Sequence, residues 1–212
     1  MDKIVLIGAG GHCKVIIDII NSVGKYDIIG ITDYNKYISN IYDIPVIGND
    51  DILSNLYNEG IHNAFICIGA LGDIKIRNKI YENLKNIGYN LPVLIHNKAI
   101  VSPFSYIDEG TCVMAGSIVN SGASIGKNSI INTGAIIEHD CLIGNNVHIS
   151  PGAILGGNVT VQDDVHVGLG ANIIQGIKIE TFSTIGAGSV VINNIGKNST
   201  VVGVPAKDIK KK

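Results

Sequence analysis

The second half of the chain carries an aliphatic residue at every sixth position. From Val101, steps of six reach Val, Ile or Leu sixteen times in succession, up to Val191. The residue four places after each of these is small in most cases, and it is Val or Ile in the others. A period of six fits neither a helix, whose period is about 3.6, nor a strand, whose period is about 2. It predicts a coil with three short strands, whose interior is filled by the aliphatic side chains.

The repeat also predicts how the coils stack. Three hexads make one coil, so the sixteen hexads predict about five coils, spaced by about 4.8 Å through hydrogen bonds between parallel strands. Residues eighteen apart then share a column, which places His148 beside His166 and His139 between Ser121 and Gly157. Glycine follows several of the sixfold aliphatic residues directly, and we expect it to relieve the backbone in the tight corners.

The residues before the repeat follow another pattern. Short β-branched runs alternate with longer amphipathic segments, which is typical of a βαβ arrangement with a parallel sheet. We therefore predict an α/β domain with a small Rossmann-like parallel sheet over residues 1–98, followed by the β-helix over residues 99–212. The strands are expected over 3–8, 27–32 and 64–69, and the helices over 11–21 and 73–86.

Composition and charge exclude several classes of protein. The formal charge is only -2 and 46% of the residues are hydrophobic, so we expect no nucleic acid partner. The four cysteines show no C-x-x-C spacing, which fits a reducing compartment and predicts neither a zinc knuckle nor a disulfide framework. The apolar run over 4–7 is far shorter than the ~20 residues of a membrane span. We expect a cytoplasmic protein with no membrane partner.

Three segments resemble a known family. The repeat resembles the hexapeptide-repeat acyltransferases, whose left-handed parallel β-helices form trimers and bind acetyl-CoA between neighbouring subunits. The ending VVGVPAK, residues 201–207, resembles the way many of those chains leave the helix. The segment IGAGGHCKVIIDII in front of such a helix is similar to the NeuD/PglD-like sugar acetyltransferases. The resemblance implies a homotrimer that uses acetyl-CoA to acetylate a nucleotide-linked amino sugar, or alternatively the hydroxyl of a sialic acid.

The resemblance gives a role to three polar residues that interrupt the aliphatic pattern. The segment AIIEHDCLIG matches the family pattern I-x-H-[DE]-C-x-I-G, which implies a general base at His139 and an acidic partner at Asp140, with Glu138 as second choice. A base is needed because an amine or hydroxyl that attacks a thioester must lose a proton. A carboxylate on the other ring nitrogen would fix the tautomer. The alternative is a solvated corner without a catalytic role.

CoA has no compact sequence motif, so its site follows from the resemblance and from the stacking. His148 is expected near the thioester. The backbone amides of Gly156 and Gly157 are expected beside the base, where they would bind the thioester oxygen. The pantetheine arm and the phosphates are expected along Leu169, Gly170, Ala187, Gly188 and Lys207.

The segment GAGGHCK follows the first strand and opens a helix, where backbone amides suit a phosphate group. We expect the nucleotide at Gly10, Gly11 and His12. Asp33 ends the second strand, where an acid can bind a ribose hydroxyl, and the resemblance adds Gly69 at the end of the third. The dinucleotide fingerprint G-x-G-x-x-G is incomplete, which makes NAD a less favoured ligand of this segment. The alternative is a turn that only packs the helix on the strand.

Two further classes of function share parts of this pattern. The γ-type carbonic anhydrases share the left-handed β-helix and bind zinc, but their close H-x4-H pair does not occur in this sequence, so we expect no metal. A non-catalytic trimeric scaffold or nucleotide-binding protein is the other alternative. The triplet at residues 138–140 argues against it, because a scaffold has no need to interrupt its repeat there.

Overall fold

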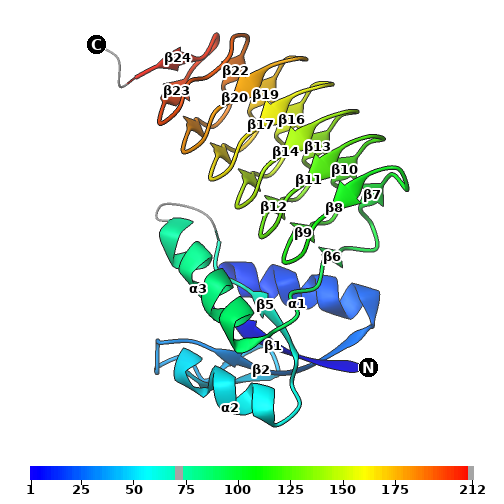
Figure 1. The fold of residues 1–212 in the computed structure, drawn as a ribbon, viewed down its shortest axis with the longest axis vertical. Helices are drawn as coiled ribbons and strands as arrows, with labels where there is room; N and C mark the ends of the chain where they lie inside the picture. The colour runs from blue at the N-terminus through cyan, green and yellow to red at the C-terminus, as the bar shows by residue number, and fades with distance from the viewer. Residues whose placement is uncertain (70–73, 210–212) are drawn as a thin grey trace. The chain divides into compact units, whose positions relative to one another are not determined.

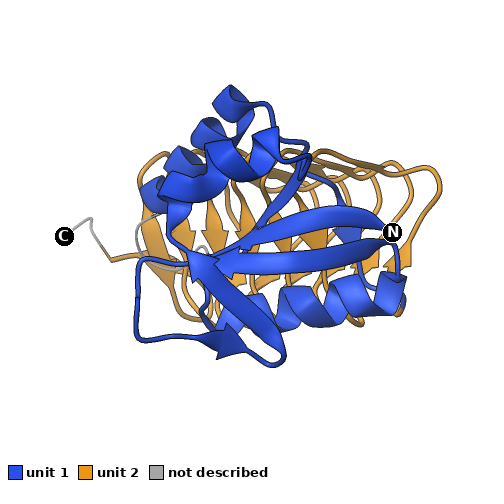
Figure 2. Cartoon of the chain, turned by 90° about the horizontal axis from the view of Figure 1, so that it is seen from below, with its two compact units in different colours: residues 1–97 blue, residues 98–212 orange. Residues whose placement is uncertain are grey.

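The apolar run near the N-terminus forms strand β1 (Asp2–Ile7) in the computed structural model, which describes residues 1–69 and 74–209. The side chains from Ile4 to Ile7 are all buried, as is typical of a parallel strand that is covered on both faces. This strand belongs to unit 1 (residues 1–97), which Figure 2 distinguishes by colour from unit 2 (residues 98–212).

Unit 1 is an α/β domain, as predicted. Its further elements are α1 (Gly11–Val23), β2 (Tyr26–Thr32), β3 (Asn40–Ile41), β4 (Ile44–Gly48), η1 (Asp50–Ile52), α2 (Leu53–Asn58), β5 (Asn63–Ile66), α3 (Ile74–Ile87) and β6 (Leu94–Ile95). The sheet order is β3-β4-β2-β1-β5, with helices on both sides (Figure 2). All pairings are parallel except that of β3 with β4. The predicted third strand ends earlier than expected, and residue 73 of the predicted helix lies outside the described residues.

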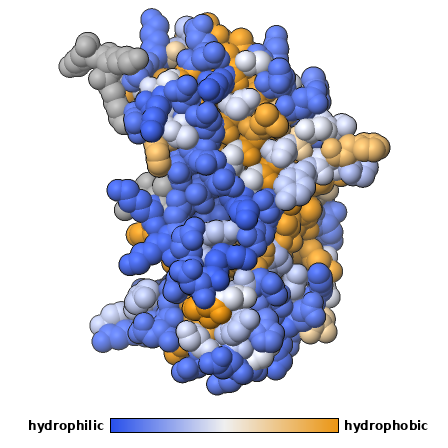
Figure 3. Space-filling model, viewed as in Figure 1, coloured by the Kyte–Doolittle hydropathy of each residue, from blue (hydrophilic) through white to orange (hydrophobic). Residues whose placement is uncertain are grey.

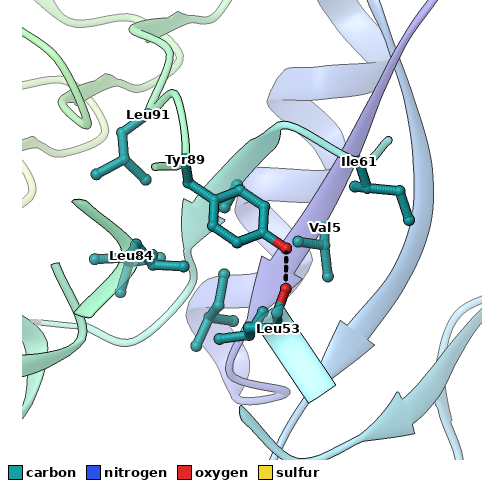
Figure 4. Close-up of a cluster of buried hydrophobic side chains, with 9 residues drawn as sticks. Val5, Leu53, Ile61, Leu84, Tyr89 and Leu91 are labelled. Carbon is teal, nitrogen blue, oxygen red and sulfur yellow. Dashed lines mark hydrogen bonds between the residues drawn. The ribbon is translucent and has the colours of Figure 1, made fainter. Parts of the chain in front are cut away.

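A buried cluster holds α2 and α3 against one face of this sheet. Val5 and Ile7 of β1 pack in it with Leu53 of α2 and Leu84 of α3. The buried Tyr89 donates a hydrogen bond from its hydroxyl to the carbonyl of Leu53 at 2.8 Å (Figure 4). Burial raises the pKa of Tyr89 to about 12, so its hydroxyl keeps the proton that it donates. The cluster thereby fixes both helices against the sheet.

Unit 2 is a left-handed parallel β-helix built mostly from two-residue strands (Figure 1). We name its three sheets by their first strands. The β7 sheet contains β7 (Ile100–Val101), β10 (Ile118–Val119), β13 (Ile136–Ile137), β16 (Ile154–Leu155), β19 (Asn172–Ile173) and β22 (Val190–Val191). The β8 sheet contains β8 (Tyr106–Ile107), β11 (Ser124–Ile125), β14 (Leu142–Ile143), β17 (Thr160–Val161) and β20 (Lys178–Ile179). Within unit 2, the β9 sheet contains β9 (Cys112–Val113), β12 (Ile130–Ile131), β15 (His148–Ile149), β18 (His166–Val167), β21 (Thr184–Ile185), β23 (Thr200–Val202) and β24 (Lys207–Asp208).

The sixfold aliphatic series forms the interior of the β-helix, as predicted. Strands pair with those eighteen residues away, for example Ile118 with Ile136. Every member of the series from Val113 to Val191 is buried, and the first two members are half-buried. Because strand side chains alternate, the first residue of each two-residue strand points outward, and the columns of outward residues can carry function.

The glycines that directly follow the aliphatic series have another role than the one expected. Left-handed backbone occurs two places later in the corner, for example at Asn158 with φ of 58° and at Gly170 with φ of 63°. A Cβ at Gly156 would lie 2.7 Å from the amide nitrogen of Gln175, and one at Gly168 would lie 2.6 Å from the carbonyl oxygen of Ile185. The expectation of unusual dihedrals was therefore wrong at these positions, which are glycine because the next coil approaches closely.

Candidate active site

The polar triplet forms the corner between β13 and β14. Asp140 takes the left-handed conformation that the corner requires, which aspartate tolerates better than most residues. Its amide donates to the carbonyl of Ser121 on the preceding coil at 3.1 Å, and the carbonyl of His139 accepts from Asn158 on the following coil at 2.9 Å. The corner is thus fixed on both sides by backbone hydrogen bonds, while the side chains of His139 and Asp140 remain 62% and 66% exposed.

The structure pairs His139 with Asp140. The imidazole Nδ1 lies 2.9 Å from Oδ2 of Asp140, so Nδ1 carries the hydrogen and the lone pair is left on Nε2. Glu138 instead accepts a 3.3 Å hydrogen bond from the backbone amide of His139. The hydrogen bond to Asp140 raises the pKa of His139 above its usual value of 6.5, and the charges of both carboxylates act in the same direction. The arrangement suits a base that accepts a proton at Nε2.

Two glycines on the neighbouring coils make room for this pair. A Cβ at Gly157, eighteen residues after His139, would lie 2.5 Å from Nε2 and 2.6 Å from Cε1 of the imidazole. A Cβ at Gly122, eighteen residues before Asp140, would lie 2.5 Å from the carboxylate Oδ1. Both contacts are far too short for a real side chain. From the sequence, Gly157 was expected in a different role and Gly122 was not expected at the site, because the clearance depends on side-chain positions that the repeat does not specify.

The two glycine amides expected beside the base differ in availability. The Gly156 amide donates to the carbonyl of Ile173 at 2.9 Å, so it belongs to the hydrogen bonds between coils and is not open. Gly157 donates to no backbone carbonyl in the part of the chain that the structure describes. Behind them, Cys141 is fully buried and donates from Sγ to the Gly156 carbonyl at 3.2 Å, and burial raises the pKa of its thiol.

The residues expected to bind CoA do not gather around the base within one chain. Leu169 and Gly170 form the corner between β18 and β19, and Ala187 and Gly188 form the corresponding corner one coil later. This edge borders the β7 sheet on the side opposite to the edge that carries His139. Leu169, Ala187 and Gly188 are exposed and Gly170 is half-buried. The exposed Lys207 lies in β24, which pairs antiparallel with β23 at the end of the β-helix.

His148 and His166 lie side by side on the β9 sheet, as predicted. Their side chains are more buried than those of a solvent-facing site would be. The rings of His148 and His166 stack with centroids 5.1 Å apart. His148 is only 4% exposed, and its Nε2 lies 3.0 Å from the side-chain amide nitrogen of Asn132. The Nε2 of His166 lies 2.9 Å from the hydroxyl of Ser150, and burial lowers the pKa of His166. His148 lies on the β9 sheet, whereas His139 lies at the corner between the β7 and β8 sheets.

In unit 1, the glycine-rich segment forms the start of α1. Gly10 caps the helix with φ of -84° and ψ of -172°, which any residue can adopt. A Cβ at Gly10, Gly11 or Gly69 would meet no atom of the described chain within 4 Å, so the fold does not require glycine at these places. Glycine there would allow a ligand to approach the backbone closely. His12, the second residue of α1, is half-buried.

A pocket of about 420 Å³ opens at the carboxyl ends of β1 and β2. Asp33 lines it and accepts hydrogen bonds from the amides of Ala9 at 2.6 Å and Asn35 at 2.7 Å, which tie the glycine-rich loop to the end of β2. None of Gly10, Gly11, His12 and Gly69 lines the pocket. Its other lining residues, most of which the sequence analysis did not identify, are Ile7, Gly8, Thr32, Tyr34, Asp50, Ile68, Ile76, Lys79, Ile80 and Asn83.

A second cavity of about 340 Å³ lies on the β8 sheet, between residues such as Leu142, Thr160 and Asp163, and contains none of the predicted site residues. Over residues 1–69 and 74–209, no helix has the length and apolar character to cross a membrane. In the same ranges, His, Cys, Asp and Glu side chains form no group of three or more that could hold a metal ion.

Comparison with known proteins covers nearly the whole chain. The family model for the PglD N-terminal domain matches residues 3–84, and that for the bacterial transferase hexapeptide (six repeats) matches residues 122–157. A variant of perosamine N-acetyltransferase from Caulobacter crescentus, solved with CoA and GDP-perosamine, is 34% identical with a TM-score of 0.92, and the match covers 98% of this chain and 97% of that one. The acetyltransferase domain of PglB from Neisseria gonorrhoeae is 37% identical with a TM-score of 0.93, over 99% and 100% of the two chains.

The β-helix of hexapeptide repeats and its exposed His–Asp corner define a hexapeptide-repeat acyltransferase. The similar structures include one solved with acetyl coenzyme A, again the PglB domain. The chain belongs to the NeuD/PglD-like family of acetyl-CoA-dependent sugar acetyltransferases, as the sequence resemblance implied.

Proposed function

We propose that the chain transfers the acetyl group of acetyl-CoA to the amino group of a nucleotide-linked amino sugar, with unit 1 holding the nucleotide and unit 2 performing the transfer. The observation that carries this proposal is the exposed His139–Asp140 pair, in which Gly157 leaves room for the imidazole at Nε2 and Gly122 leaves room for the carboxylate. The similarity to an N-acetyltransferase of perosamine favours an amine over a sialic acid hydroxyl as the acceptor. All four cysteines are buried as thiols, which fits the cytoplasmic location expected from the sequence.

The geometry supports direct transfer. The acceptor amine attacks the thioester carbonyl, and its proton passes to Nε2 of His139 as the C–N bond forms. Asp140 holds Nδ1 and stabilises the imidazolium, as a carboxylate does in other histidine bases. The amide of Gly157 is available for the negative charge on the thioester oxygen. The C–S bond then breaks, and the imidazolium returns the proton to the CoA thiolate.

The wild-type reaction is the first test. The protein is incubated with acetyl-CoA and a panel of nucleotide-linked 4-amino sugars, and thiol release and product mass are measured. We expect stoichiometric release of CoA and an acetylated amino sugar with at least one member of the panel. Acetylation of sialic acid, with every amino sugar left unchanged, would contradict the proposal.

We further propose that the active unit is a homotrimer with sites between neighbouring copies. The outward residues of the β7 sheet are mostly aliphatic, and Figure 3 shows hydrophobic side chains gathered along the β-helix. These residues are Ile100, Ile118, Ile136, Ile154 and Val190. The His139 corner borders this sheet on one edge and the Leu169 corner on the other, so a site that uses both edges needs a second copy. A cyclic trimer supplies three such seams.

Co-expression of two inactive variants tests the shared site. His139→Ala removes the base, and Ala187→Trp fills the opposite edge without backbone strain, because φ at Ala187 is not left-handed. Each mixed trimer contains one seam with both edges intact, so random mixing should restore about a quarter of the wild-type rate. Light scattering should give the trimer mass. No recovery in purified mixed trimers would mean that each site uses one chain only.

The nucleotide site is tested best at Gly10. Asp33→Ala would also release the amide of Ala9 and disturb the loop, whereas Gly10→Ala adds one methyl group to open space in an ordinary conformation. We expect KM for the nucleotide-linked sugar to rise about tenfold, equivalent to the loss of about 1.4 kcal/mol of binding, while KM for acetyl-CoA stays unchanged. Gly196→Ala on the β-helix is the control, because a Cβ there meets only Ser199 Oγ at 4.0 Å. Equal changes in both KM values would place the nucleotide elsewhere.

A further inference from the structure

The pocket of unit 1 combines apolar walls with carboxylates and one lysine. This combination indicates which nucleotide base the pocket can bind. We propose that the pocket selects guanine, and that the carboxylate of Asp50 accepts the adjacent N1–H and N2–H groups of that base. The inference rests on the proposed function, since it names which nucleotide carries the amino sugar. Asp50 lies at the start of η1, in a segment that the sequence pattern did not single out.

The two carboxylates of the pocket are not equivalent. Both oxygens of Asp33 accept backbone amides, from Ala9 and Asn35, so this residue shapes the loop around the pocket. Asp50 accepts one hydrogen bond at Oδ1, from the hydroxyl of Thr32 at 2.7 Å. Its Oδ2 has no hydrogen-bond donor among residues 1–69 and 74–209. Asp50 is therefore the carboxylate of this pocket that is available to a ligand.

The walls of the pocket suit a flat aromatic ring. Ile7, Ile68 and Ile80 come from β1, the segment after β5 and α3, and they surround the space with aliphatic surface. A volume of about 420 Å³ lies within the range of roughly 300–1,000 Å³ that is typical of small-molecule sites. Such sites take orientation from a few polar groups among apolar walls. In this pocket Asp50 and, from α3, Lys79 supply polar groups of opposite charge.

The hydrogen-bonding edges of the bases decide which one fits this pair of charges. Guanine presents two adjacent N–H donors and one carbonyl oxygen, which match a carboxylate and an ammonium group. Uracil and thymine present a single N–H between two carbonyl oxygens, one of which would face the carboxylate. Cytosine and adenine present one amino group next to a ring nitrogen acceptor. A carboxylate accepts only, so guanine alone satisfies both of its oxygens.

The electrostatics of Asp50 favour a ligand that donates hydrogen bonds to its carboxylate. Burial raises the pKa of Asp50, and the charges of Asp33 and Asp51 raise it further, against the effect of the Thr32 hydroxyl. No cation forms an ion pair with Asp50 in the described ranges. Its charge also raises the pKa of Tyr34 at the same pocket. Two N–H donors from a base would stabilise this half-buried carboxylate in its ionised form.

Calorimetric titration of the full-length protein with GDP, IDP and UDP tests the inference. The three probes share ribose and diphosphate, and IDP differs from GDP only by the missing 2-amino group. Because a hydrogen bond to a charged group contributes substantially to binding, we expect GDP to bind about tenfold more tightly than IDP or UDP. Asp50→Asn should weaken GDP binding by about tenfold and remove the difference between GDP and IDP.

Asp51→Asn is the matched control. The side chain of Asp51 is exposed, accepts from the side-chain amide of Asn49 at 2.8 Å, and does not line the pocket. This variant should bind the three probes as the wild type does. Asparagine at position 50 keeps an acceptor for Thr32, and thermal unfolding without nucleotide checks that the variant is folded.

The outcomes separate the two proposals. A wild-type protein that binds UDP as tightly as GDP overturns the guanine assignment and leaves the proposed function standing. Retention of the GDP–IDP difference in folded Asp50→Asn protein overturns the role of Asp50. Failure of all three nucleotides to bind overturns both the inference and the nucleotide site on which the proposed function depends.

Discussion

Replacement of His139 by alanine should lower kcat by about 10²- to 10⁴-fold, which is the usual contribution of a positioned general base. The acceptor amine would then lose its proton to water alone. Affinity for CoA, measured by titration, should stay near that of the wild type, because the residues expected to bind it lie on the other edge of the β7 sheet. Steady-state kinetics with a saturating acceptor provide the measurement.

The pH dependence of the same reaction tests the role of Asp140 as the hydrogen-bond partner of His139. The lone pair on Nε2 is available only when His139 is neutral, so kcat should rise with pH through the pKa of His139 and then level off. The hydrogen bond to Asp140 raises this pKa above 6.5, and so the rise should be centred above that value. Asp140→Asn removes the negative charge, which should move the rise to lower pH and reduce the plateau by less than His139→Ala does.

Two results would contradict the direct mechanism. One is near wild-type turnover in His139→Ala, with His62→Ala as the control for loss of an exposed histidine elsewhere. The other is an acetyl group trapped on Cys141 by rapid quenching and mass spectrometry. We expect no such adduct, because Cys141 is fully buried and burial raises the pKa of its thiol.

Gly157→Ala should lower kcat by about 10²-fold, since a displacement of about 1 Å at a reacting group has effects of this size. The added methyl group would lie 2.5 Å from Nε2 of His139, so the imidazole must turn away from its present position. The backbone at Gly157 is not left-handed and its amide is retained, so the substitution isolates the steric effect. Kinetics and denaturant unfolding should be measured together.

A double variant and a matched control make this test specific. If Gly157→Ala acts by moving His139, then adding it to His139→Ala should cost almost nothing further, because the two changes remove the same interaction. Gly196→Ala, also on the β-helix, should leave both kcat and the free energy of unfolding near wild type. Wild-type kcat in Gly157→Ala would show that the imidazole works from another position.

Much of the fold could be predicted because each part follows a short period. The β-helix repeats every six residues with one interior position, so sixteen hexads give its register and place columns such as His148 and His166. In unit 1, β1 and β5 are mostly buried and stand out as apolar runs. The segment from β3 to α2 was missed because its elements are short, and β4 contains Pro45, so neither strand nor helix periodicity develops.

The candidate site was predictable only where its chemistry is local in sequence. His139 and Asp140 are neighbours, so their pairing could be expected from the triplet. The clearance at Gly122 depends on the position of a carboxylate one coil away. The pocket around Asp50 collects side chains from β1, η1 and α3, and their association arises from tertiary packing alone. Such groups share no spacing that a single sequence can display.

The stacking of three coils at the His139 corner also constrains how this chain can change in length during evolution. Gly122, the His139–Asp140 pair and Gly157 lie on successive coils, joined by the backbone bonds of Asp140 to Ser121 and of Asn158 to His139. Insertion or deletion of one residue between positions 122 and 157 would exchange interior and exterior side chains and bring a larger residue against the imidazole. Insertions of a whole eighteen-residue coil beyond this segment preserve every contact of the pair. The β-helix can therefore lengthen in units of one coil while the contacts around the His139–Asp140 pair stay unchanged.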